Sequence, residues 1–183
     1  MGTGAEIIHF LIQTIAGIYL FAVVLRLLLQ ACRADFYNPI SQLVVRITDP
    51  VVRPLRRVIP GFAGIDFATV LVALAIQMLT ISVLLLLLGY GLINPLILLA
   101  WSAIGLVSLV LRFYFIAIIV MIILSWFAQG VYHPAILLLH QLTEPIMSPF
   151  RRLLPPLGGL DLSPIIVLLV LQIVVKGLIL GCV

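Results

Sequence analysis

The stretch TDPVVRPLRRVIPGFAGIDFA, from Thr48 to Ala68, returns in nearly the same form as TEPIMSPFRRLLPPLGGLDLS, from Thr143 to Ser163. The two copies align at a constant offset of 95 positions without a gap. Identities at this offset begin upstream, at the tyrosine and proline of YNP and YHP, and continue downstream to the glutamines Gln77 and Gln172. A repeat of this length predicts a duplicated chain with two related halves.

The composition around this repeat is that of a membrane protein. Hydrophobic residues make up 64% of the chain, charged residues only 9%, and the mean hydropathy is +1.38. Soluble domains carry about 25% charged residues. A run of 18 or more apolar residues is long enough to cross a bilayer. The chain is therefore predicted to be an all-α integral membrane protein, and its beginning is interpreted as a first span and not as a cleaved signal peptide.

Four apolar runs give the expected spans: 7–31, 67–88, 92–128 and 163–183. The third run is long, since a helix from Pro95 to Phe127 would extend about 50 Å. Dividing it at Arg112 would need a turn, yet the local sequence LVLRFYF contains no turn-forming residue. Asn94–Pro95 instead favours a helix start. Four spans are expected, and five spans with inverted repeats are the alternative.

The repeat and the spans together predict the organisation of the chain. Residues 1–88 form the first repeat (span, motif 33–66, span), residues 89–102 a connector, and residues 103–183 the second repeat with its motif at 129–162. An even number of crossings separates the motifs, so the repeats are parallel and share one face. Eight of the ten basic residues lie at that face, which the positive-inside bias assigns to the cytoplasm, with both termini outward.

Each motif is expected to hold short amphipathic helices. Asp49–Pro50 and its counterpart Glu144–Pro145 resemble helix starts, with apolar residues on one face and arginines on the other. A preceding helix is predicted to open at Asn38–Pro39 and at His133–Pro134, and the inner prolines Pro54 and Pro149 predict a kink. Each motif is therefore interpreted as two short helices that lie at the membrane interface or re-enter it.

Seven charged residues of the motifs are the candidate lipid- or partner-binding site: Arg53, Arg56, Arg57, Asp66, Arg151, Arg152 and Asp161. Two interpretations stay open for the aspartates. They either pair with the arginines to form polar pockets under the membrane surface, or they cap the following helices while the arginines extend to lipid headgroups.

A second set of polar residues lies inside the spans: Gln77, Arg112 and Gln172. Intramembrane polar residues suggest a functional site by default. The alternative is that the glutamines hold helices together and that Arg112 extends to the interface. Cys32 and Cys182 form no CxxC pattern, and no catalytic or phosphate-binding motif occurs, so no enzyme, metal or cofactor is predicted.

The duplicated DPVVRPLRRVIPGFAGIDF and EPIMSPFRRLLPPLGGLDLSP, with DFYNPISQ before the first copy, resemble the YggT (YlmG) family of bacterial integral inner-membrane proteins over essentially the whole chain. The first copy departs from the family pattern by Ala63 and by Ala68–Thr69. The resemblance implies links to osmotic or potassium stress tolerance and to envelope or division-related organisation. For plastid relatives it implies assembly of a photosynthetic cytochrome complex and nucleoid distribution. It implies no catalytic residue.

The expected function is that of a non-catalytic scaffold or assembly factor of the inner membrane. Its expected partners are anionic headgroups and another membrane complex or a second copy of the chain, and no nucleic acid is indicated. An ion or osmolyte pathway is the alternative. A lipid-acting enzyme that uses Asp66 and Asp161 is a third and minor hypothesis.

Overall fold

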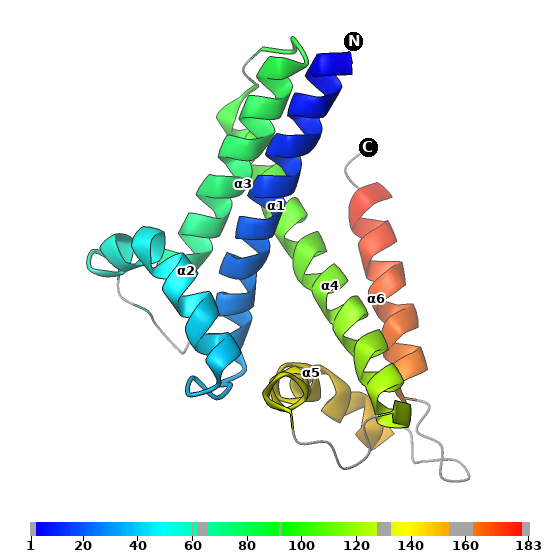
Figure 1. Ribbon diagram of the computed structural model, residues 1–183. Helices are drawn as coiled ribbons and strands as arrows, with labels where there is room; N and C mark the ends of the chain where they lie inside the picture. The colour runs from blue at the N-terminus through cyan, green and yellow to red at the C-terminus, as the bar shows by residue number, and fades with distance from the viewer. Residues whose placement is uncertain are drawn as a thin grey trace. The chain divides into compact units, whose positions relative to one another are not determined.

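The computed structural model describes residues 3–59, 61, 66–91, 93–127, 133–153 and 163–180. Within these residues the chain forms six helices and no strand (Figure 1). The helices are α1 (Thr3–Ala31), α2 (Pro39–Arg56), α3 (Phe67–Leu87), α4 (Pro95–Phe127), α5 (Pro134–Leu153) and α6 (Ser163–Leu180). The predicted all-helical fold is confirmed over this part of the chain.

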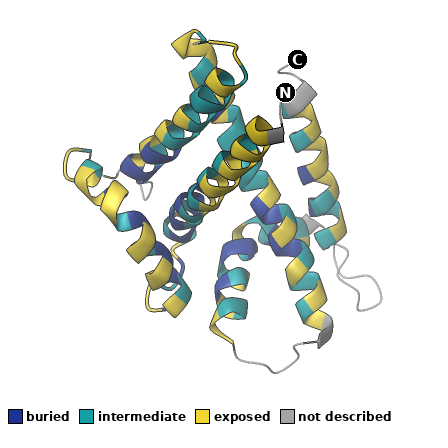
Figure 2. Ribbon diagram, turned by 45° about the horizontal axis from the view of Figure 1, so that its top comes forward, coloured by how far each residue is buried: buried dark blue, intermediate teal, exposed yellow. Residues whose placement is uncertain are grey.

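Three of the helices, α1, α3 and α4, are long and apolar enough to cross a membrane, and α6 is a shorter apolar helix. Their surfaces are apolar as well. Large apolar side chains such as Ile15 and Ile173 are more than half exposed, and Figure 2 shows exposed residues along the length of α6. Surfaces of this kind need lipid around them, as in an integral membrane protein.

The chain divides into two compact units. Unit 1 comprises Met1–Ala31 and Leu43–Val107, and unit 2 comprises Cys32–Gln42 and Ser108–Val183. In unit 1, α1 packs along α3, and in unit 2, α5 packs against α6. The buried apolar residues of unit 1 include Val23, Val24, Leu29, Val72 and Ala73. Those of unit 2 include Ala117, Ile118, Leu142, Met147 and Val167.

Three predicted helix starts are confirmed, each at a proline that follows a capping side chain. The Leu96 amide donates to Asn94 Oδ1 at 2.9 Å, where α4 begins, and the Ile40 amide donates to Asn38 Oδ1 at 3.0 Å, where α2 begins. His133 Nδ1 accepts from the Ala135 amide at 3.2 Å at the start of α5. Proline suits these positions because its missing N–H is one that the first turn leaves unpaired anyway.

Helix α4 extends without a break through Arg112. The alternative of two spans divided at this arginine is therefore wrong. The helix continues because the residues around Arg112 are all good or neutral helix formers and none of them favours a turn.

The motif helices differ from the prediction. α2 and α5 are single helices of 18 and 20 residues that continue through two prolines each, so the interpretation of each motif as two short helices is wrong. Asp49 lies in the middle of α2 and caps nothing. Pro50 and Pro54 are four residues apart and both exposed, and each removes one backbone hydrogen bond from the helix. On the other side of α2, Thr48 and Val52 are fully buried, and their packing stabilises the helix.

Candidate functional site

Helix α2 has three distinct faces. The first is buried and contains Val44, Thr48 and Val52. The second is apolar yet exposed, with Leu43, Ile47 and Val51 between 45% and 57% accessible. The third carries the exposed arginines Arg46, Arg53 and, just past the helix end, Arg57. A helix that packs on protein with one face and offers both apolar and cationic side chains outward is typical of the boundary between hydrocarbon and headgroups.

A buried arginine from α1 fixes α2 in place. The Arg26 side chain is only 5% exposed, and its Nη1 lies 2.7 Å from Asp49 Oδ1. The same nitrogen donates to Thr48 Oγ1 at 2.9 Å, and Thr48 in turn donates to the Val44 carbonyl. A buried guanidinium requires a carboxylate, and Asp49 provides it. Because Asp49 is 39% exposed, its own carboxylate stays partly hydrated. The pair joins the end of α1 to the middle of α2.

Asp66 combines the two roles that the sequence left open. Its side chain is fully buried, and it caps α3 by accepting from the Thr69 amide at 3.3 Å and the Thr69 hydroxyl at 2.9 Å. Its Oδ2 also lies 3.5 Å from Arg56 Nε. In the first copy, therefore, the aspartate caps the next helix and pairs with a motif arginine at the same time.

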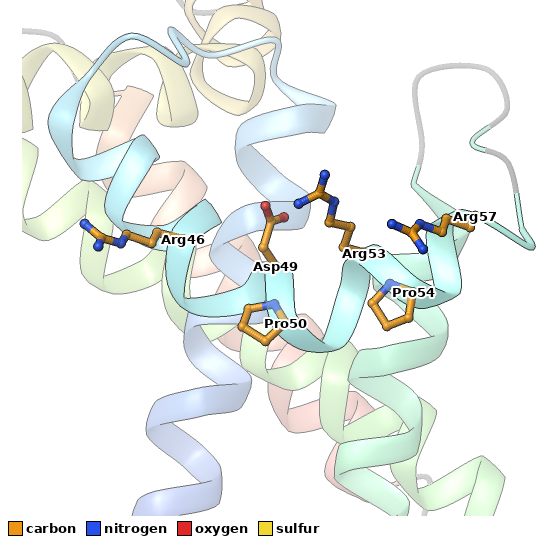
Figure 3. Close-up of a pocket in the computed structure, with 6 residues that line it drawn as sticks. All are labelled: Arg46, Asp49, Pro50, Arg53, Pro54 and Arg57. Atoms are coloured by element: carbon orange, nitrogen blue, oxygen red, sulfur yellow. The ribbon is translucent and has the colours of Figure 1, made fainter.

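The remaining arginines of α2 line a groove. Figure 3 shows Arg46, Asp49 and Arg53 along α2 and Arg57 just past its end, with Pro50 and Pro54 beside them. We call this set of six residues the arginine groove; its volume is about 480 Å³. An adjoining hollow of about 580 Å³ shares Asp49, Arg53 and Arg57 with it and adds Arg26 and Arg56.

Within the described part of the chain, no ion pair joins the three groove arginines to a carboxylate. Asp49 pairs with Arg26, and Asp66 pairs with Arg56. The groove therefore carries an excess of positive charge at an exposed position, with only one carboxylate in its lining. Guanidinium groups in this arrangement are suited to phosphate, which they bind with paired hydrogen bonds.

The second copy differs in its charges. Arg151 Nη1 contacts Glu144 Oε2 at 2.9 Å, and His140 Nδ1 lies 3.8 Å from the same oxygen. Both partners of the arginine pair are about 40% exposed. Arg152 is exposed, and Asp161 lies outside the described residues. At the offset of 95, Met121, Gln141 and Ser148 stand where the first copy has Arg26, Arg46 and Arg53.

Within unit 2, the beginning of α2 lies against α5. Asn38 Nδ2 donates to the Pro134 carbonyl at 2.7 Å, and the Asp35 amide donates to Gln141 Oε1 at 3.0 Å. A hollow of about 550 Å³ opens beside this contact, and its lining includes Tyr37, His133 and His140. Asp35 and Asn38 of the first motif are thus in direct contact with residues of α5 in the second.

The three polar residues predicted inside the spans lie on three different helices. Gln77 on α3 packs over Gly105 on α4, where an added Cβ would lie 2.6 Å from Gln77 Nε2. This close approach fits the interpretation of Gln77 as a residue that holds helices together. Arg112 and Gln172 are exposed on α4 and α6. Their role in a polar site stays a prediction.

In the described residues, neither the cysteine nor the His, Asp and Glu side chains form a metal site. Cys32 Sγ lies 3.7 Å from the Tyr114 hydroxyl and 3.8 Å from the Leu142 carbonyl, and Cys182 is outside the described part. Among the residues that are described, no cluster of three or more His, Cys, Asp or Glu could hold a metal ion.

Three residues of the site were absent from the predicted set: Arg26, Asp49 and Arg46. A signal for Arg26 was present, because it interrupts an apolar run where the second copy has Met121. A charge in such a run needs a partner, and the acidic residue of the nearby motif was available. The pattern Asp49–Pro50 favours a helix start instead, so the sequence does not single out Asp49 as the partner of Arg26.

The chain is similar throughout its length to one protein family. The model of the CCB3/YggT family matches residues 5–88 and again residues 100–181. An uncharacterized protein of Pseudomonas aeruginosa is 49% identical over 166 residues, which cover 90% of this chain and 84% of the relative. The uncharacterized protein YggT of Escherichia coli K12 is 39% identical over 168 residues, or 92% of this chain and 87% of the relative.

A more distant relative comes from a plant. The YlmG homolog protein 2, chloroplastic, of Arabidopsis thaliana is 44% identical over 63 residues, which are 34% of this chain and 24% of that protein. No solved structure matches the chain. The family model covers both halves of the sequence, and the bacterial relatives align over most of their own length. The chain therefore belongs to the CCB3/YggT family.

Proposed function

We propose that this protein is a non-catalytic scaffold or assembly factor of the bacterial inner membrane, with α2 as its docking surface at the inner leaflet. One observation carries the proposal. α2 presents an exposed apolar face and the arginine groove side by side, while its third face is buried against the protein. Such a helix is suited to holding headgroups and partner proteins at the membrane surface, and its groove contains no set of groups arranged for catalysis.

The proposed topology has four crossings, α1, α3, α4 and α6, with both motifs at the cytoplasmic face. The contact of 2.7 Å between Asn38 and Pro134 supports a shared face, because the hydrocarbon core is about 30 Å thick. The basic residues of the motifs favour the cytoplasm. The double match of the family model, at an offset close to that of the repeated phrase, supports two parallel repeats.

Single cysteines test this topology. Tyr37 at the first motif is 89% exposed, and Tyr90 just after α3 is 74% exposed. In a variant with Cys32 and Cys182 replaced by Ser, we expect Tyr37→Cys to react with a membrane-impermeant maleimide only from the cytoplasmic side. Tyr90→Cys should react only from the outside, because α3 separates the two positions. Labelling of both cysteines from one side would contradict the topology.

Co-purification tests the docking role. The triple variant Arg46→Gln, Arg53→Gln, Arg57→Gln removes the positive charge of the groove and leaves Arg26 and Arg56 with their carboxylates. We expect this variant to lose a stoichiometric membrane complex that the unchanged protein retains in mild detergent. The matched control, Arg33→Gln, Arg151→Gln, Arg152→Gln, removes the same number of charges outside the groove and should retain the complex.

Two results would contradict this function. The first is retention of the same complex by the groove variant. The second is ion or osmolyte flux in liposomes that contain only this protein, at a rate well above protein-free liposomes. That flux would favour the pathway hypothesis, and its dependence on Gln77, Arg112 and Gln172 could then be measured with single Ala variants.

A further inference from the structure

We propose that the arginine groove of the first copy binds the headgroup of one anionic phospholipid per chain, and that the second copy has no equivalent site. This inference rests on the proposed position of α2 at the inner leaflet and names the ligand of its groove. Three features of the molecule support this site: the charge of the groove, the apolar surface beside it, and the difference between the two copies.

The charge of the groove calls for an anion. The nearby carboxylates, Asp49 and Asp66, form their ion pairs with Arg26 and Arg56, and in the described residues no ion pair joins Arg46, Arg53 or Arg57 to a carboxylate. Along the helix, Arg46 and Arg53 are about 10 Å apart and Arg53 and Arg57 about 6 Å apart. Like charges at this spacing repel each other, and a phosphate between them relieves the repulsion while accepting several N–H bonds.

The surroundings of the groove favour a lipid over a soluble phosphate compound. The apolar face of α2, with Leu43, Ile47 and Val51, lies on the same helix and is between 45% and 57% exposed. Pro50 and Pro54 add apolar surface to the groove lining itself. A phospholipid can bind the guanidinium groups with its phosphate and cover the apolar face with its acyl chains. A soluble phosphate compound can bind the guanidinium groups but leaves the apolar face exposed.

The second copy lacks two of the three arginines from which the groove is built. Gln141 and Ser148 replace two of the three arginines, and Arg151 has Glu144 at 2.9 Å. A phosphate approaching α5 would therefore meet one arginine already paired with a carboxylate and the exposed Arg152. The two copies therefore differ in charge, because the first has three arginines at the groove positions and the second has only Arg152 there.

The test measures lipid retained by the purified full chain. The protein is exchanged into detergent with phosphatidylglycerol or phosphatidylcholine, and bound lipid is counted by native mass spectrometry over a titration. We expect one phosphatidylglycerol per chain to bind at least tenfold more tightly than phosphatidylcholine, and a rise in salt to weaken it. The groove variant Arg46→Gln, Arg53→Gln, Arg57→Gln should lose this preference, while Arg33→Gln, Arg151→Gln, Arg152→Gln should retain it.

Several outcomes would overturn the inference. These are an unchanged preference in the groove variant, an equal loss in the control variant, and displacement of the lipid by equimolar soluble glycerol phosphate. If the triple variant does not fold, Arg53→Gln alone is used, because Arg53 lines both hollows. A preference lowered less than twofold by this single change would then reject the site.

The lipid measurement is independent of the co-purification experiment. A groove variant that loses its protein complex but retains phosphatidylglycerol would refute the lipid site and leave the docking function in place. A variant that loses the lipid yet retains the complex would refute docking through the groove and support the lipid site.

Discussion

Replacing Asp49 by Asn is expected to lower the free energy of unfolding by roughly 2–3 kcal/mol. The change leaves the Arg26 guanidinium, which is 5% exposed, without its carboxylate at 2.7 Å. Breaking a fully buried ion pair by removing one partner costs about 3–5 kcal/mol, and the partial exposure of Asp49 reduces this value. The remaining hydrogen bond from Arg26 to Thr48 does not replace the lost charge.

The measurement is thermal or denaturant-induced unfolding of the purified protein in one detergent. The second copy supplies a matched control, since Glu144 is the counterpart of Asp49 at the offset of 95. Its pair with Arg151 is about 40% exposed on both sides, so Glu144→Gln should change stability by less than about 1 kcal/mol. Equal destabilisation by both changes would contradict the role of the buried pair.

Removing the other partner of this pair, Arg26, is expected to lower the free energy of unfolding by less. Arg26→Met introduces the residue that the second copy carries at position 121. It leaves behind Asp49, a partly hydrated carboxylate that shares its groove with three exposed arginines. We therefore expect Arg26→Met to destabilise the protein less than Asp49→Asn. The opposite order would mean that the charge of Arg26 is solvated by other means.

Replacing Asp66 by Ala is expected to be the second strongly destabilising change, at roughly 2–3 kcal/mol. The side chain is fully buried and caps α3, and loss of a capping side chain costs about 1 kcal/mol. The buried Thr69 hydroxyl, which donates to Asp66 at 2.9 Å, is then left without this acceptor, which adds about 1–3 kcal/mol. The costs overlap because all these groups share one carboxylate.

The order of three variants tests this explanation in the same unfolding assay. Asp66→Asn keeps an acceptor for the Thr69 amide and should cost less than Asp66→Ala. Arg56→Gln removes only a partner that is 49% exposed and lies 3.5 Å away, so it should cost less than about 1 kcal/mol. An effect of Arg56→Gln as large as that of Asp66→Ala would mean that the ion pair, and not the cap, dominates.

The helix starts and the continuity of α4 could be predicted because they depend on local chemistry. Asn38, Asn94 and His133 each precede a proline, and a capping side chain followed by proline favours a helix start in almost any tertiary context. The unbroken course of α4 follows in the same way from the lack of turn-forming residues around Arg112. The apolar runs predict the long helices directly, because in lipid a spanning segment must pair its backbone polar groups internally, as a helix does.

The motif helices and their central ion pair depend on tertiary contacts, and there the prediction failed. A proline inside a helix normally costs about 3 kcal/mol, so two helices per motif were the reasonable prediction. The burial of Thr48 and Val52, and the contact of Arg26 with α2, outweigh that cost. Neither could be derived from the motif alone, because the partner lies in another helix, 23 positions upstream of Asp49.

Helix α4 has a consequence for the bilayer around the protein. Its 33 residues reach about 50 Å, whereas the hydrocarbon core is about 30 Å thick. In the proposed topology, in which α4 crosses the bilayer, a helix this much longer than the hydrocarbon core must tilt, extend beyond the core or thicken the lipid around it. The fit of this protein to its surroundings therefore depends on acyl-chain length, and thicker membranes accommodate α4 with less inclination than thin ones.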